Sequence, residues 1–197
     1  MRNNHARYLL AGSPRTPSRS AALLNLSQHW LQQQNVEVIP YTLHDFQADD
    51  LLRANFNSPD VSAFVAQLAT ADGLLIATPI YKASFSGALK TLLDLLPERA
   101  LDHKVVLPLA TGGSIGHMLA VDYALKPVLT ALKAQEVLHG VFVDDSQVVF
   151  HGEQVTVSTS ATTRLEEALE SFYLALGRRK PLASNAVSSS LVQQTAA

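Results

Sequence analysis

The sequence predicts an α/β protein with a flavodoxin-like fold, a doubly wound sheet of five parallel strands in the order 2-1-3-4-5. Five short apolar runs alternate with segments of helical periodicity. The runs are continuously apolar, which is typical of parallel strands that are covered on both faces. Five such units in a chain of 197 residues fit this sheet and a single core.

Each expected element comes from a local pattern. Strands are expected over residues 8–11, 36–41, 73–78, 104–110 and 137–143. Helices are expected over residues 20–33, 58–71, 86–95, 117–133 and 162–176. Pro108 has no N–H to donate to a central ladder, so we expect a bulge in the fourth strand. Residues 1–7 should form a polar extension, residues 8–180 the folded domain, and residues 181–197 a disordered tail.

Composition excludes several classes of function. The net charge is −2, so the chain has no basic field to hold a nucleic-acid backbone. It has no cysteine, which removes disulfides, thiolate nucleophiles and cysteine metal sites. Its seven histidines are scattered without a ligand pair, so no metal site is predicted. No apolar run approaches the ~20 residues that span a bilayer, and we expect a cytoplasmic protein without a membrane partner.

The loop after the first strand offers an anion site. In open sheets of this kind, ligands bind beyond the carboxyl ends of the strands. The loop that runs into the first helix carries three hydroxyls and a guanidinium, from Ser13, Arg15, Ser18 and Ser20. Free N–H groups and the helix dipole favour a phosphate there. Four phosphate-compatible side chains in this one loop favour an anion site over an ordinary capped turn. The loop matches neither the Walker motif nor G-x-G-x-x-G, so a mononucleotide or similar phosphate is the favoured ligand.

Two further loops follow the third and fourth strands. Residues 78–87 carry two aromatic side chains, a lysine and a run of backbone amides, which suit a planar heterocycle. The alternative is a hydrophobic loop that packs on its neighbours. Residues 111–116 contain paired glycines, which let a ligand approach the backbone closely.

The third loop also permits a different class of enzyme. Residues 112–116 match G-x-S-x-G, the nucleophile elbow of serine hydrolases, with Ser114 as the nucleophile. Asp144 or Asp145 and then His151 follow in the Ser–Asp–His order. No glycine-rich oxyanion motif lies upstream, however, and the Ser/Arg loop would have no role. The hydrolase is therefore the weaker alternative.

Three segments together resemble the NADPH-dependent FMN reductase family. They are LAGSPRTPSRS at 10–20, ADGLLIATPIYKASFSGALKTLLDLLP at 71–97, and LPLATGGSIGHMLAVDYALKPVLTALKAQEVLHGVFVDDSQV at 107–148. More narrowly, the chain looks like the flavin reductase of two-component alkanesulfonate monooxygenase systems. The resemblance extends over residues 8–176.

The resemblance implies that FMN and NADPH bind here and assigns residues to the flavin. The phosphate would contact Ser13, Arg15, Ser18 and Ser20. The ribityl chain and isoalloxazine would be bordered by Pro79, Ile80, Tyr81, Lys82 and Ser84. The pyrimidine edge would face Thr111, Gly112, Gly113 and Ser114.

The implied activity is reduction of FMN by hydride transfer from NADPH, which requires no side chain as general acid or base. We therefore predict binding residues and no catalytic side chain. Members of this subgroup release the flavin, so FMNH2 would pass to a sulfonate monooxygenase for the use of alkanesulfonates as a sulfur source. A flavodoxin-like carrier that keeps FMN and a quinone reductase stand as alternatives. The residues leave the choice of NADPH or NADH open.

The helix expected over residues 117–133 contains Pro127, which leaves the carbonyl of Tyr123 without its helical partner. A kink or a π-type bulge near Tyr123 follows. The resemblance implies a π-helix that places this tyrosine at a tetramer interface. We expect a homotetramer, with a dimer as the alternative.

Overall fold

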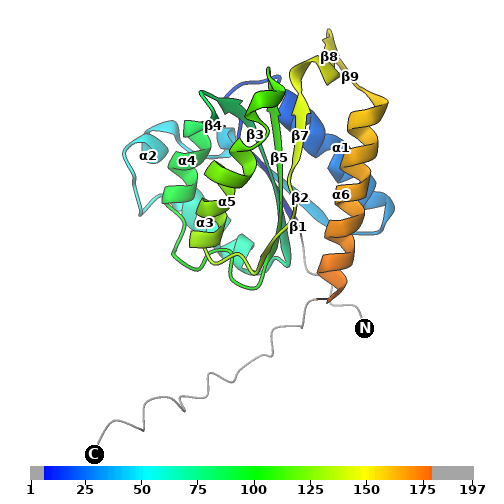
Figure 1. The fold of residues 1–197 in the computed structure, drawn as a ribbon. Coiled ribbons are helices and arrows are strands. Elements are labelled where there is room, and N and C mark those ends of the chain that lie inside the picture. The colour runs from blue at the N-terminus through cyan, green and yellow to red at the C-terminus, as the bar shows by residue number, and fades with distance from the viewer. Residues whose placement is uncertain (1–6, 179–197) are drawn as a thin grey trace, which may run out of the picture.

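A parallel sheet forms the middle layer of the computed structural model, which describes residues 7–178. Helices cover both of its faces (Figure 1). One face carries α1 (Arg19–Gln33) and α6 (Thr159–Arg178). The other carries α3 (Pro59–Ala69), α4 (Gly87–Asp94) and α5 (Lys126–Ala131). The predicted doubly wound architecture is confirmed.

The strand order also agrees with the prediction. Four strands lie side by side in the order β2 (Val38–Thr42), β1 (Arg7–Ala11), β3 (Gly73–Tyr81) and β5 (Val105–Gly112), and β2 forms one edge of the sheet. The place beyond β5 is shared by β6 (Glu136–Val137) and β7 (Val141–Asp144), both parallel to it. This is the 2-1-3-4-5 arrangement with its fifth strand in two pieces.

Pro108 accounts for the break in the fifth strand. The carbonyl of Val106 accepts a hydrogen bond from Leu138 N–H at 2.9 Å, so the backbone groups of Val106 face the outer strand. Positions two residues apart face the same side of a strand, so Pro108 also faces outward, where it has no N–H to donate. Pairing with β5 stops at Val106 and resumes at Leu109. The predicted bulge is wrong, since β3 and β5 pair without a skipped residue.

Each face of the sheet buries its own apolar core. Phe172 of α6 is fully buried on one face, and Phe64 of α3 is fully buried on the other. Burial of a side chain of this size contributes about 1.5–3 kcal/mol. Gly73 at the start of β3 permits close packing, because a Cβ there would lie 2.6 Å from the Phe172 ring.

The segment before α5 confirms the predicted disruption of this helix. A short 3₁₀ turn, η2 (Ile115–His117), is followed by a π-helix, η3 (Val121–Leu125), that runs directly into α5. Tyr123 lies at the centre of the π-helix. The structure thus has the π form rather than a simple kink.

Several short elements have no counterpart in the prediction. They are η1 (Leu43–Asp45), α2 (Ala48–Leu52), β4 (Ser84–Phe85), η4 (Asp145–Gln147) and the hairpin of β8 (Val148–His151) with β9 (Gln154–Val157). The hairpin stands apart from the main sheet, above α6 in Figure 1.

The predicted ends of the domain are only partly described. Arg7, the last residue of the expected extension, is the first residue of β1. The rest of that extension and the expected tail over residues 181–197 lie outside the described residues. Within residues 7–178, no helix is long and apolar enough to cross a membrane.

Candidate active site

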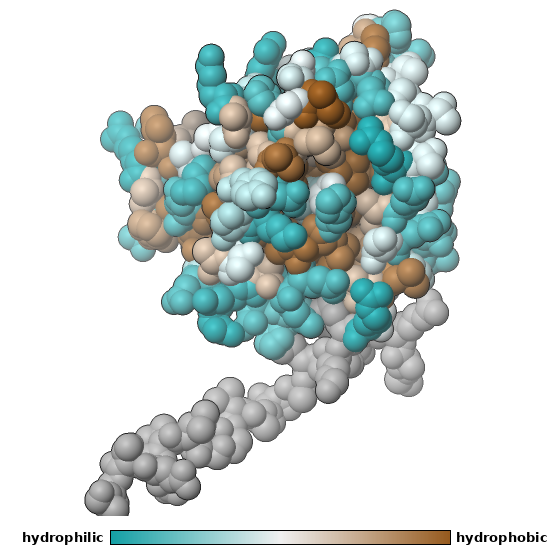
Figure 2. Space-filling view, in the orientation of Figure 1, coloured by the Kyte–Doolittle hydropathy of each residue, from teal (hydrophilic) through white to brown (hydrophobic). Residues whose placement is uncertain are grey.

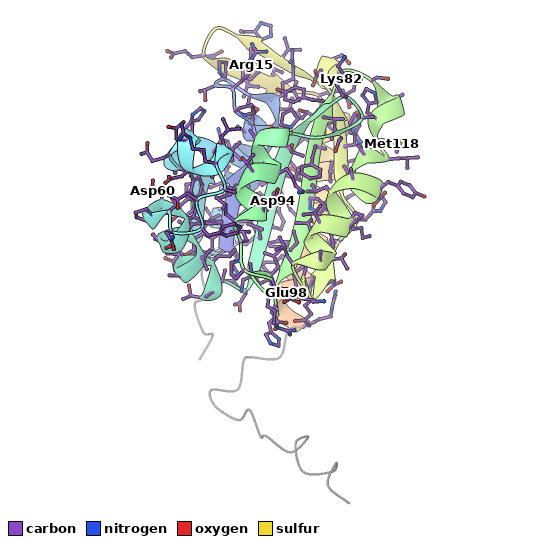
Figure 3. The ribbon with its side chains drawn as sticks, turned by 90° about the vertical axis from the view of Figure 1, so that its left-hand side faces the viewer. Arg15, Asp60, Lys82, Asp94, Glu98 and Met118 are labelled. Atoms are coloured by element: carbon purple, nitrogen blue, oxygen red, sulfur yellow. The ribbon has the colours of Figure 1, made fainter. Side chains whose placement is uncertain are left out.

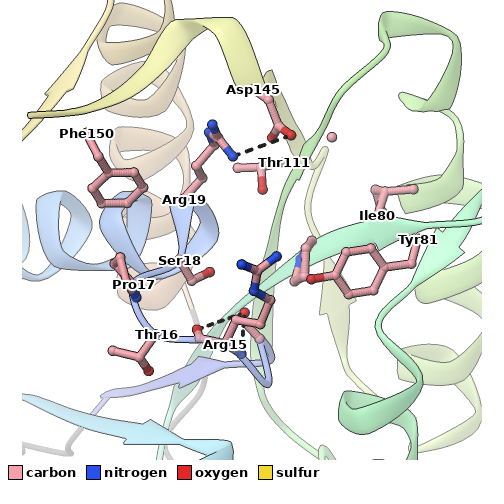
Figure 4. Close-up of a pocket in the computed structure, with 13 residues that line it drawn as sticks. Arg15, Thr16, Pro17, Ser18, Arg19, Ile80, Tyr81, Thr111, Asp145 and Phe150 are labelled. Carbon is pink, nitrogen blue, oxygen red and sulfur yellow. Dashed lines mark hydrogen bonds and ion pairs between the residues drawn. The ribbon is translucent and has the colours of Figure 1, made fainter.

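A cavity of about 350 Å³ lies where the loops after β1, β3 and β5 meet (Figure 4). This edge, beyond the carboxyl ends of the strands, is where open parallel sheets bind ligands. The lining residues are Ser13, Arg15, Thr16, Pro17, Ser18, Arg19, Pro79, Ile80, Tyr81, Thr111, Gly112, Asp145 and Phe150. The cavity thus brings together members of all three predicted loops.

The loop between β1 and α1 supplies the polar side of the cavity. Ser18 is the N-cap of α1 and accepts a hydrogen bond from Ala21 N–H. The Ser13 hydroxyl lies 3.2 Å from the backbone N of Arg15, which donates to it. The Arg15 guanidinium is exposed and makes no hydrogen bond or ion pair with the rest of residues 7–178. It is therefore available to an anion in the cavity.

Ser20 has a different position from the other predicted phosphate residues. Its side chain is fully buried and does not line the cavity. The two hydroxyls of Ser18 and Ser20 share a hydrogen bond of 2.9 Å. Ser20 therefore does not face the cavity, and its hydroxyl holds that of Ser18 in position.

The second loop is a tight hairpin between β3 and β4. Lys82 and Ala83 form its turn, with positive φ angles of 50° and 63°. The strand side of the turn, Pro79 to Tyr81, lines the cavity. Lys82 and Ser84 do not line it: Lys82 is exposed and Ser84 is half-buried. Figure 3 shows Lys82 and Arg15 at the same end of the molecule, away from Asp94 and Glu98.

The third loop lines the cavity only with its first two residues. A Cβ on Gly112 would lie 3.2 Å from the Phe142 ring, so glycine permits this tight wall. Thr111 is buried beside it. Gly113 and Ser114 are exposed and do not line the cavity. The Ser114 hydroxyl instead accepts from Gly116 N–H at 3.3 Å and caps η2.

Five lining residues lie outside the set predicted to bind the flavin: Thr16, Pro17, Arg19, Asp145 and Phe150. Asp145 had been considered only for the alternative hydrolase. Thr16, Pro17 and Arg19 lie within the loop for which an anion site was predicted, so their place in the sequence already pointed to the cavity. Phe150 belongs to the unpredicted hairpin, and no sequence signal marks it. Figure 4 shows Phe150 and Tyr81 on opposite sides of the cavity.

The alternative hydrolase has no assembled triad. No hydrogen bond joins Ser114 to His151 in the described part of the chain, and His151 is exposed on β8. The Asp144 carboxylate accepts hydrogen bonds from the hydroxyl and the backbone N–H of Ser146. Both bonds lower the pKa of Asp144, and the bond from the hydroxyl has the larger effect. That carboxylate thus caps η4. Among residues 7–178, no cluster of three or more potential ligands could hold a metal ion.

The donors and walls of this cavity fit a flavin mononucleotide. Hydroxyls, a free guanidinium and a helix N-terminus suit a phosphate dianion. No acidic residue lies in the first turn of α1 to oppose such a ligand. The apolar surface from Pro79 to Tyr81 suits a planar ring.

Comparison with known proteins agrees with this chemistry. Residues 8–148 match the family model for NADPH-dependent FMN reductase, and the chain belongs to this family. It is 58% identical over 186 residues to the FMN reductase (NADPH) of Pseudomonas putida KT2440, covering 93% of this chain and 94% of that protein. It is 61% identical over 170 residues to the FMN reductase (NADPH) of Escherichia coli K12, covering 86% and 89%.

A solved structure is also similar. The apo form of the NADH:FMN oxidoreductase EMOB superposes with a TM-score of 0.79 and 35% sequence identity, over 90% of this chain and 92% of that one. The chain is an oxidoreductase, an FMN reductase that uses NADPH. The predicted family, enzyme class and cofactors are confirmed.

Proposed function

We propose that this reductase binds FMN in the cavity, reduces it and releases FMNH2 to a separate monooxygenase that cleaves organosulfonates for their sulfur. The observation that carries the proposal is one open cavity with an anion-binding side and an apolar wall. Delivery to a sulfonate monooxygenase is supported by the resemblance to the reductases of two-component alkanesulfonate systems.

The phosphate of FMN would lie at the β1–α1 loop. Arg15 offers a guanidinium with no competing partner in the described chain, and Ser13 and Ser18 offer hydroxyls whose positions the loop already fixes. Ser20 contributes through its hydrogen bond to Ser18. A charge-assisted, two-pronged contact from arginine is stronger than a neutral hydrogen bond, so Arg15 would contribute most.

The isoalloxazine would lie between the second and third loops. Pro79, Ile80 and Tyr81 form its apolar wall, with Lys82 and Ser84 at the outer edge. The pyrimidine edge would face Thr111 and Gly112, with the backbone N–H groups of Gly113 and Ser114 beyond them. Donors aimed at this edge stabilise the negative charge that develops there on reduction.

When bound, FMN supplies the redox chemistry by accepting a hydride from the nicotinamide of NADPH. The chain would contribute position: Arg15 would hold the phosphate end of the flavin, and Pro79, Ile80 and Tyr81 would orient its ring end. Reacting atoms must approach within about 3–3.5 Å, so this orientation matters for the rate. No side chain has to carry a proton in the reaction, and we assign no general acid or base.

The openness of the site supports release of the flavin. Tyr81 is 46% exposed although it forms the apolar wall, and Arg15 is exposed as well. A ligand bound between two exposed side chains would keep contact with solvent. Affinity falls when a ligand is only partly buried, which suits a substrate that must leave.

We also propose that Tyr123 lies at an interface between copies of this chain in a tetramer. Its side chain is 79% exposed on the π-helix, and Ile115, Met118 and Leu119 are exposed on the same segment. Figure 2 shows apolar side chains among hydrophilic ones on this side of the molecule. Clustered apolar exposure of this kind marks interaction surfaces.

A coupled assay tests the proposed function. The reductase, NADPH and FMN are mixed with an FMNH2-dependent alkanesulfonate monooxygenase and an alkanesulfonate, and the released sulfite is measured. Sulfite formation that requires the reductase, NADPH and free FMN supports the proposal. A yellow protein that keeps its flavin and yields no sulfite favours the flavodoxin-like carrier. Fast quinone reduction with no sulfite favours a quinone reductase.

A further inference from the structure

A carboxylate, that of Asp145, lines a cavity that otherwise suits an anion. Asp145 opens η4, and the residue before it, Asp144, pairs with Gly112 of β5. The Asp145 Oδ2 atom lies 3.8 Å from the point that a Cβ on Gly113 would occupy. The carboxylate is therefore beside the paired glycines, at the place proposed for the pyrimidine edge of the flavin.

Asp145 has unused capacity to accept hydrogen bonds. Its ion pair with Arg19 spans 3.7 Å from Oδ2 to Nη1, which is too long for a hydrogen bond. Asp144 differs, because its Oδ1 already accepts from the N–H and the hydroxyl of Ser146, at 2.9 and 2.6 Å. Of these two neighbouring carboxylates, Asp145 is the one that lines the cavity, and neither of its oxygens accepts a hydrogen bond from the described residues, so it can take a donor from a ligand.

The position of Asp145 is supported from both sides. Arg19 Nε donates to the carbonyl of Val148, the first residue of β8, at 3.0 Å. This bond holds the guanidinium beside Asp145, and Figure 4 shows the ion pair between the two side chains. Behind the turn, Gln147 donates to Ser160 Oγ at 2.9 Å and anchors η4 to the start of α6. Arg19 also offsets part of the repulsion between this carboxylate and a bound phosphate.

The flavin edge explains why such a carboxylate would be useful. The pyrimidine edge presents two carbonyl oxygens with one N–H, at N3, between them. Backbone N–H groups of a glycine loop can serve the oxygens, but the N3–H needs an acceptor. A donor left without a partner in a site costs its full desolvation.

We propose that the Asp145 carboxylate accepts the hydrogen bond from flavin N3–H and makes the cavity selective for an unsubstituted imide. The inference rests on the proposed binding of FMN in this cavity. Asp145 is then a specificity-determining residue, and Arg19 is the positioning residue that holds it. Neither residue exchanges protons or electrons with the ligand.

The test is binding of FMN and of 3-methyl-FMN, followed by flavin fluorescence without turnover. Wild-type protein should bind 3-methyl-FMN about tenfold or more weakly than FMN, since the methyl group removes a charge-assisted hydrogen bond. In Asp145→Ala, the affinity for FMN should fall until the two flavins bind almost equally. Asp145→Asn keeps an acceptor oxygen and should keep most of the preference for FMN.

Asp144→Asn is the matched control, because it removes the same charge one residue away and should keep the wild-type preference. An unchanged preference in Asp145→Ala would overturn the inference, as would an equal loss in Asp144→Asn. Both flavins are titrated into one preparation, so the ratio is independent of the folded fraction. Asp145→Gly repeats the test should the alanine variant not fold. Wild-type protein that binds neither flavin would overturn the proposed FMN site as well.

Discussion

The hydroxyl of Thr78 accepts a hydrogen bond from the backbone N–H of Ser86 at 3.0 Å, and both residues are buried. The same oxygen lies 3.0 Å from the carbonyl of Pro79, to which it donates. One hydroxyl therefore ties together the two ends of the β3–β4 hairpin. This hairpin carries the wall on which we propose that the isoalloxazine lies.

Replacement of Thr78 by valine should weaken this closure. Thr78→Val keeps the side-chain shape but leaves the Ser86 N–H buried without an acceptor, at a cost of about 1–3 kcal/mol. The free energy of unfolding in urea should fall by this amount, and FMN should bind more weakly. Thr70→Val is the control, because Thr70 donates to Gln67 on an exposed turn and should change stability by less than about 0.5 kcal/mol. Equal losses in the two variants would contradict the role given to Thr78.

The phosphate contact can be separated from the ring contacts by comparing FMN with riboflavin. Arg15→Ala should weaken FMN binding about tenfold or more, because a charge-assisted contact is lost. Riboflavin has no phosphate, and its affinity should not change. Arg99→Ala, which removes an exposed ion pair with Asp102, serves as the charge-matched control and should change neither affinity. An equal loss for both flavins in Arg15→Ala would show that Arg15 does not contact the phosphate.

Ser114 distinguishes the reductase from the hydrolase alternative. Its hydroxyl accepts only from Gly116 N–H among the described residues, so Ser114→Ala should leave most of the NADPH oxidation rate intact. A serine hydrolase would lose nearly all of its activity on the same change. The rates of the wild-type protein and of Ser114→Ala, measured with FMN and NADPH and with an ester substrate, decide between the two classes.

Tyr123 should matter for assembly. Tyr123→Ala should shift the sedimentation profile from tetramer toward smaller species and make FMN co-purify with the protein. Leu174→Ala, at a residue 61% exposed on α6, changes a large exposed apolar side chain elsewhere and should do neither. A colourless Tyr123→Ala protein that sediments as the wild type does would remove Tyr123 from the interface.

Much of the fold follows from local sequence patterns. Continuous apolar strands and amphipathic helices alternate strongly enough to define the sheet order before any contact is known. Pro127 was sufficient to predict a disrupted helix near Tyr123, because its missing N–H leaves the Tyr123 carbonyl without a partner. The choice of a π-helix over a kink came from the family resemblance. Pro108 was harder to interpret. Its missing N–H interrupts the pairing of β5 with the outer strand, which is split into β6 and β7. The sequence alone does not show whether Pro108 faces this strand or β3.

The site was predictable where one loop carries the chemistry. The anion loop and the 79–81 wall line the cavity, because the carboxyl ends of adjacent parallel strands converge. Ser20 differs because helix geometry turns its side chain inward, which sequence spacing alone does not show. Phe150 was missed because its hairpin reaches the cavity from beyond β7, through tertiary contacts such as Arg19 with Val148.

The most direct test of flavin reductase activity is steady-state oxidation of NADPH by the purified protein, with and without added FMN, and with NADH in parallel. A reductase that uses FMN as a substrate should show turnover that requires added FMN, saturates with it and is faster with NADPH than with NADH. A yellow protein that barely oxidises either nucleotide, and does so regardless of added FMN, would contradict it.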